Sequence, residues 1–93
     1  MGQEGSGMFP MIEMPRVIRA TDITRGDQRY LVSTVRLPYD DETVIWETLV
    51  FETKASGKRG GAVGRPHTYE SEEEAISEHQ RLCSEWQPPE EDY

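Results

Sequence analysis

The chain has a single cysteine, Cys83, so it can form neither an internal disulfide framework nor a CxxC metal or redox pair. Apolar residues are also few, at 34% of 93 residues, and no run of them approaches the length needed to span a bilayer. The start of the sequence lacks a basic segment followed by an apolar stretch, so we expect no secretory signal. These features predict one small cytosolic domain with a limited core.

Catalytic signatures are missing as well. The two histidines are not accompanied by a serine or cysteine motif of known mechanics. The Gly-rich stretch around Lys58 fails as a phosphate-binding loop, because Arg59 follows the lysine where serine or threonine is required. We therefore predict that the protein is not an enzyme and has no cofactor.

A metal site is weakly suggested by His79 and Cys83, which lie one helical turn apart, with His67 shortly before them. Imidazole and thiolate are zinc ligands, but a structural site needs four. A histidine and a cysteine on an apolar helix stripe are more often packing residues. The carboxylates at positions 40–42 fit turn chemistry without a cation, so no metal is predicted.

Basic residues are nearly absent from the last quarter of the chain. Residues 1–69 hold nine acidic and nine basic side chains, whereas residues 70–93 hold nine acidic side chains and only Arg81, which accounts for the net charge of −8. Such a surface keeps a small protein soluble, repels nucleic acid and attracts basic protein surfaces.

What is present is a β-ribbon over residues 29–53. Runs rich in Val, Ile, Thr and aromatic residues predict strands at 28–37 and 43–53, preceded by one at 16–21. Pro38 ends the second run, and Asp40 and Asp41 suit the turn that follows. Three strands with short turns predict an antiparallel meander.

A helix is predicted over residues 71–86. Ser71 and Glu74 have the spacing of a capping box, and Pro88 follows the last turn. Apolar and small side chains recur on one stripe at helical spacing. The predicted fold is α+β, a three-stranded antiparallel meander with this C-terminal helix packed on one sheet face.

The domain is expected to span residues 15–87. Residues 1–14 form a flexible N-terminal segment, of which MGQEGSG has the composition of an expression-tag remnant. Four glycines and four basic residues at 54–66 predict a flexible loop inside the domain, and residues 88–93 form an acidic tail.

Both faces of the ribbon carry apolar residues, and one helix cannot cover both. Alternation separates Leu31 from Tyr30 and Ile45 from Trp46, but a one-residue slip in the turn exchanges which sets share a face. In either register we expect large apolar residues such as Trp46 or Phe51 on the face without the helix. A second copy covering that face would stabilise the domain, so a homodimer is predicted.

The runs YLVSTVRLP, WETLVFET and TYESEEEAISEHQ resemble a class of small proteins from bacteriophages of actinobacteria. Those proteins tend to read STVRLP, YETMVF and Y-x-T/S-x-E-E-A before a helix containing GH. Here the matching positions are 33–38, 46–51, 69–75 and His79, with Trp46 where Tyr is common and Glu78 where Gly often precedes the histidine. The resemblance implies a small non-enzymatic phage product.

We therefore expect a protein that binds a host or phage protein in the host cytoplasm, without membrane association. Two alternatives are a nucleic-acid mimic that blocks a host DNA-binding enzyme and a minor virion or assembly component. Direct nucleic-acid binding through the basic loop is less favoured. The predicted partner-binding residues are Trp46, Phe51, Tyr30, Glu72, Glu73 and Glu78.

Overall fold

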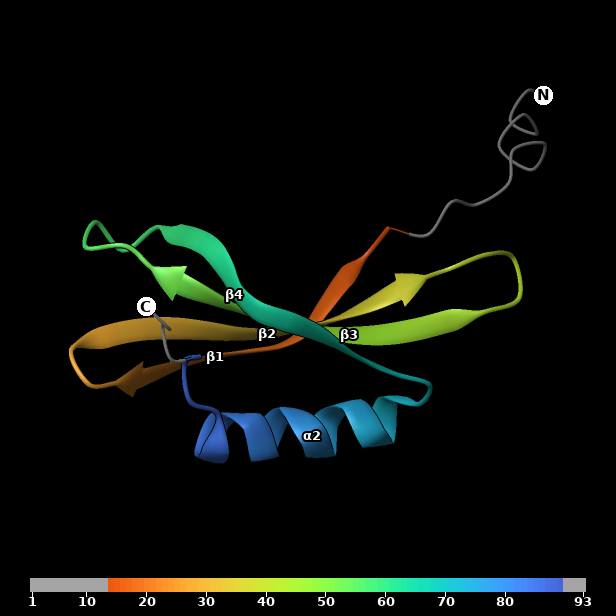
Figure 1. The fold of residues 1–93 in the computed structure, drawn as a ribbon. Helices are drawn as coiled ribbons and strands as arrows, with labels where there is room; N and C mark the ends of the chain where they lie inside the picture. The colour runs from red at the N-terminus through yellow and green to blue at the C-terminus, as the bar shows by residue number, and fades with distance from the viewer. Residues whose placement is uncertain (1–13, 90–93) are drawn as a thin grey trace, which may run out of the picture.

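The computed structural model describes residues 14–89, which form four antiparallel strands and one helix (Figure 1). The strands follow one another in the sheet in chain order, and the helix packs on one face. The α+β class with one helix on an antiparallel sheet is confirmed, whereas the prediction of three strands is wrong. The elements are β1 (Arg16–Arg25), β2 (Gln28–Pro38), β3 (Val44–Thr53), β4 (Arg59–Tyr69) and α2 (Glu72–Glu85).

The extra strand, β4, occupies most of the stretch that its glycines predicted to be a loop. Only residues 54–58 form the turn, where Gly57 has φ +91°. Thr48 pairs with His67 and Val50 with Val63, so three residues of β4 face the single Leu49 of β3. This bulge contains Gly64, whose φ of +80° is a backbone conformation that glycine adopts more readily than other residues.

Proline in β4 is tolerated at the same irregularity. Pro66 lies within the bulge, on a strand that has a sheet neighbour on one side only. A second register shift occurs between Phe51 and Thr53, near Gly60. A Cβ at Gly60 would lie 3.1 Å from the Glu52 carbonyl oxygen, so the close approach of the two strands there favours glycine.

Two short turns set the register of the first three strands. Arg25 pairs with Gln28 across Gly26 and Asp27, and Gly26 has φ +63°, as type II′ hairpins require at this position. In the β2–β3 turn the Asp40 carboxylate accepts a 2.8 Å hydrogen bond from the Glu42 amide. That bond is the main cause that lowers the pKa of Asp40.

Helix α2 begins as predicted. The Ser71 hydroxyl accepts a hydrogen bond of 3.1 Å from the Glu74 amide, which satisfies one of the helix's free N–H groups. The last turn has no basic residue of its own. Arg25 supplies one from β1, donating to the carbonyls of Cys83 and Trp86 at 2.7 Å each.

The core is small and lies between the sheet and α2. Val32 and Val50 at its centre are 0% and 2% exposed, and they pair across β2 and β3. Tyr30 meets Trp86 edge-to-face with ring centroids 4.9 Å apart. The cluster of buried apolar residues consists of Ile23, Tyr30, Val32, Val50 and Leu82.

Residues 1–13 and 90–93 lie outside the described part of the chain, so the predicted N-terminal segment is described only at Met14. The same holds for all but Pro88 and Pro89 of the predicted acidic tail.

Candidate interaction surface

The strand register decides which apolar residues lie away from the helix. Val32 pairs with Val50 in the core, so the residues on either side of them project from the opposite face of the sheet. Leu31 pairs with Phe51, and Leu37 pairs with Ile45. Together with their neighbours they form what we call the open face: Leu31, Val35, Leu37, Ile45, Leu49 and Phe51.

No helix or strand within residues 14–89 covers the open face, since the only described helix lies beneath the other side of the sheet (Figure 1). All six of its residues are nonetheless only partly exposed. Val17 on β1 pairs with Val35 and extends the apolar area with a side chain that is 57% exposed. The open face is thus a largely apolar surface across three strands, with Glu47 opposite Val35 and Asp22 opposite Leu31 as the acidic residues on it.

The middle of the open face is marked by Ser33 and Leu49. These residues pair with each other near the midpoints of β2 and β3. Ser33 is only 6% exposed although no helix covers it, because larger side chains surround its short one. The surface is therefore closely packed at its centre and has Leu49 as the larger side chain there.

The two ends of the sheet carry opposite charge. The β1–β2 and β3–β4 turns lie together at one end, at the left of Figure 1, and the β2–β3 turn lies at the other. The first end carries three acidic residues, Asp22, Asp27 and Glu52, and a larger number of basic ones. We call it the basic end for Arg29, Lys54, Lys58 and Arg59. The second, the acidic end, carries Asp40, Asp41, Glu42 and Glu47, while its arginines Arg16, Arg19 and Arg36 lie on the helix side of the sheet.

The basic end reaches onto the open face itself. Arg29 and Arg59 lie on the open side, in register with Thr24 and Thr53. The Arg59 guanidinium carbon lies 4.6 Å from the centre of the Phe51 ring, in a cation–π arrangement. A cation is therefore fixed directly beside the apolar surface.

Among the three aromatic residues predicted to bind a partner, only Phe51 lies on the open face. Tyr30 is in the core, and its 6% exposure leaves almost no surface for a partner. Trp46 pairs with Arg36 and Tyr69 on the helix side of the sheet. Predicting the partner-binding residues correctly required the strand register, which sequence alone did not supply. The leucine and isoleucine residues of the open face were not among the predicted residues.

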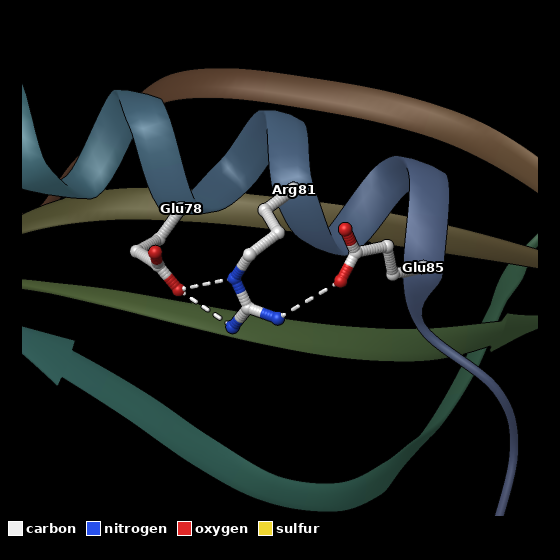
Figure 2. Close-up of polar contacts among 3 residues, drawn as sticks. All are labelled: Glu78, Arg81 and Glu85. Carbon is white, nitrogen blue, oxygen red and sulfur yellow. Dashed lines mark hydrogen bonds and ion pairs between the residues drawn. The ribbon is translucent and has the colours of Figure 1, made fainter.

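The predicted acidic residues Glu72, Glu73 and Glu78 lie on α2, away from the open face. Figure 2 shows the Arg81 guanidinium between Glu78 and Glu85, at 2.6 Å and 3.5 Å. The Arg81 hydrogen bond lowers the pKa of Glu78, and Glu78 in turn raises the pKa of Arg81. Arg81 thus neutralises part of this surface, which reduces the array of carboxylates available to imitate nucleic-acid phosphates.

A buried polar network lies beneath α2. His79 is 2% exposed, and its ring nitrogens lie within hydrogen-bond distance of two hydroxyls, Thr34 at 2.7 Å from Nδ1 and Thr21 at 2.9 Å from Nε2. Thr34 also bonds Thr48 across the two central strands, at 2.5 Å. Burial, and to a lesser degree the charge of Arg19, lowers the pKa of His79. The neutral imidazole links the helix to three strands.

Two further polar atoms are buried near this network. The Trp46 indole N–H and the Tyr69 hydroxyl, on neighbouring strands, have no hydrogen-bond partner within the described residues. Burial is the main cause that raises the pKa of Tyr69. The Thr48 hydroxyl is close enough to lower that pKa, although the pair lacks hydrogen-bond geometry.

Metal-binding geometry is not found over residues 14–89, where no three His, Cys, Asp or Glu side chains come together in a way that could hold an ion. Cys83 and His79 instead pack against the sheet, with Cys83 half-buried beside the core. Nor does the described part of the chain contain a helix long and apolar enough to cross a membrane.

Comparison with protein-family models, with curated proteins and with solved structures gives no match for this chain.

Proposed function

We propose that this is a small non-enzymatic phage protein that acts in the host cytoplasm by binding a phage or host protein through the open face. The observation that carries the proposal is the group of six apolar side chains on the sheet face that the helix does not cover. Burying partly exposed aliphatic and aromatic side chains against a partner is favourable in proportion to the apolar area removed from water. The phage origin rests on the sequence resemblance.

The form of the surface also supports binding. Apolar side chains lie at the centre, around Leu49, and charged residues lie at both ends. Stable protein interfaces combine an apolar centre with a polar rim, and contiguous exposed apolar surfaces mark interaction sites. The acidic side of α2 faces away and would remain accessible to a basic protein after the open face is covered.

A retention experiment with three forms of the immobilised chain tests this function. The forms are the natural chain, Leu49→Glu at the centre of the open face, and Gln80→Glu, which adds the same charge at an exposed position on α2. We expect the natural chain and Gln80→Glu to retain one defined protein, or further copies of the chain, at a stoichiometric level. Leu49→Glu should lose it, because the new carboxylate would be buried without a partner.

Circular dichroism must show that all three forms are folded. Retention of the same proteins at the same level by Leu49→Glu and the natural chain would contradict the proposed function.

A further inference from the structure

We infer that the occupant of the open face is a second copy of this chain, packed face to face with its strands reversed. The inference rests on the proposed function of the open face and names its partner. It is carried by the distribution of charge along the strands. When the strands of one copy run opposite to those of the other, the basic end of each copy lies against the acidic end of its partner.

Charge first determines which sides of two copies can meet. The net charge of −8 comes entirely from residues 70–93, whereas residues 1–69 are neutral. Helix α2, which carries five of the six described acidic residues of that segment, lies on the side opposite the open face. Packing through the open faces therefore keeps the acidic helices of the two copies on the outside, where water and salt screen their repulsion.

Charge next determines the relative direction of the two sheets. With parallel strands, the basic end of one copy would lie on the basic end of the other, and the acidic ends would coincide as well. A two-fold axis that runs between the sheets and across the strands reverses this arrangement. It brings Arg29 and Arg59 of one copy toward the end that holds Glu47 and the β2–β3 turn of the other.

The position of the axis follows from the register. The paired residues Ser33 and Leu49 lie near the midpoints of their strands, so reversing the strands about this point superimposes the apolar centres. In a two-fold interface each patch meets its own copy, and residues near the axis contact their equivalents. Leu49 would therefore pack against the Leu49 of the second copy, with the charged ends forming the rim.

Pairing through the sheet edges is less favourable than packing through the faces. The outer strand β4 has two register shifts and contains Pro66, and the other outer strand, β1, has a register shift between Val17 and Arg19. Bulges and proline disrupt the row of backbone groups that another strand would need. The edges oppose strand addition, while the open face presents apolar surface to be covered.

The inference is tested by measuring the mass of the chain in solution by light scattering from ~1 to ~100 µM. We expect a mass that approaches twice the 10.7 kDa of one chain as concentration rises. Leu49→Glu should remain a monomer, because it places two carboxylates together at the axis, while Gln80→Glu should still dimerise.

Charge reversal tests the direction of packing. Lys58→Glu with Arg59→Glu reverses part of the basic end, and Asp41→Lys with Glu42→Lys reverses part of the acidic end. We expect each double variant to weaken dimerisation by about tenfold, and all four changes together to restore it to within about threefold of the natural chain.

The possible failures are distinguishable. A natural chain that stays monomeric at the highest concentration overturns the inference, but leaves the proposed function intact if Leu49→Glu still abolishes retention of another protein. A dimer that Leu49→Glu disrupts, but in which the combined charge variant is no tighter than either double variant, overturns the reversed packing. A dimer unaffected by Leu49→Glu overturns the inference, and the proposed function falls with it only if Leu49→Glu also retains the same proteins as the natural chain.

Discussion

At the scale of single residues, His79 is the side chain whose protonation matters most to the fold. It is 2% exposed and lies within hydrogen-bond distance of Thr34 and Thr21, so charging it would place a cation in the core. The pKa of His79 is lowered by this burial and by Arg19. Its ordinary value, to which unfolding returns it, is 6.5.

We predict that the free energy of unfolding decreases as the pH falls from 7.5 to 5.5. Below pH 6.5 the unfolded chain binds a proton at His79 that the folded chain does not. The stability that the neutral His79 contributes is therefore fully present above pH 6.5 and is lost as the pH falls below it. Urea unfolding at fixed chain concentration measures it. The carboxyl groups of Asp40 and Glu78, whose pKa values are lowered from 3.8 and 4.5, titrate below this window.

Two variants isolate the cause. His79→Gln should remove this pH dependence whatever its effect on absolute stability, whereas His67→Gln, which changes the histidine outside the network, should retain it. An equal free energy of unfolding of the natural chain at pH 7.5 and pH 5.5 would contradict the predicted effect of His79 protonation.

The residue scale also shows where sequence reasoning stops. Alternation along β2 and β3 correctly separates Leu31 from Tyr30 and Ile45 from Trp46. Which of these sets faces the helix depends on the length of the β2–β3 turn, because a shift of one residue exchanges the faces. Trp46 and Tyr30 were therefore predicted to bind a partner although they lie on the helix side, and Leu49 was not predicted.

At the scale of elements, Arg25 joins two segments that are far apart in the chain. Its guanidinium, at the end of β1, donates to the Cys83 and Trp86 carbonyls of the last turn of α2, which has no basic residue of its own. A cation at this position also interacts favourably with the negative end of the helix dipole. The end of the helix is thus fixed by a strand about sixty residues earlier.

We predict that Arg25→Lys lowers the free energy of unfolding by about 1–3 kcal/mol, because the ammonium cannot reproduce the two-branched hydrogen bonding of the guanidinium. Urea unfolding measures the loss. Amide exchange at Trp86, which bonds to Leu82, should become faster. The exposed Arg65 provides the control, and Arg65→Lys should change stability by less than about 0.5 kcal/mol. Equal effects of the two substitutions would contradict a specific role for Arg25.

Helix α2 could be predicted from sequence, whereas β4 could not. Ser71, the first-turn glutamates and the apolar stripe are local signals, and they give the helix its observed limits. Gly57, Gly64 and Pro66 are also local signals, but they indicate irregular backbone. Gly57 lies in the turn before β4, and Gly64 and Pro66 lie in its bulge. Strand formation there depends on pairing with β3, which a local pattern does not reveal.

At the scale of the whole molecule, the fold places two kinds of surface on opposite sides. Acidic residues in excess lie on the helix side, and the other side presents the open face between a basic end and an acidic end. Composition predicted a small core, and alternation along the ribbon predicted an uncovered sheet face. Neither predicted that the two ends of the sheet differ in charge, because that depends on which turns lie at the same end of a four-stranded sheet.

The most direct measurement is NMR on a mixture of carbon-13-labelled and unlabelled chains, filtered to show only contacts between different copies. We predict intermolecular contacts between the methyl groups of Leu49 of both copies, and between Leu31 of one copy and Val35 of the other, which lie two residues to either side of the axis. Intermolecular contacts confined to β1, β4 or α2, or none at concentrations where the mass is that of a dimer, would contradict the account.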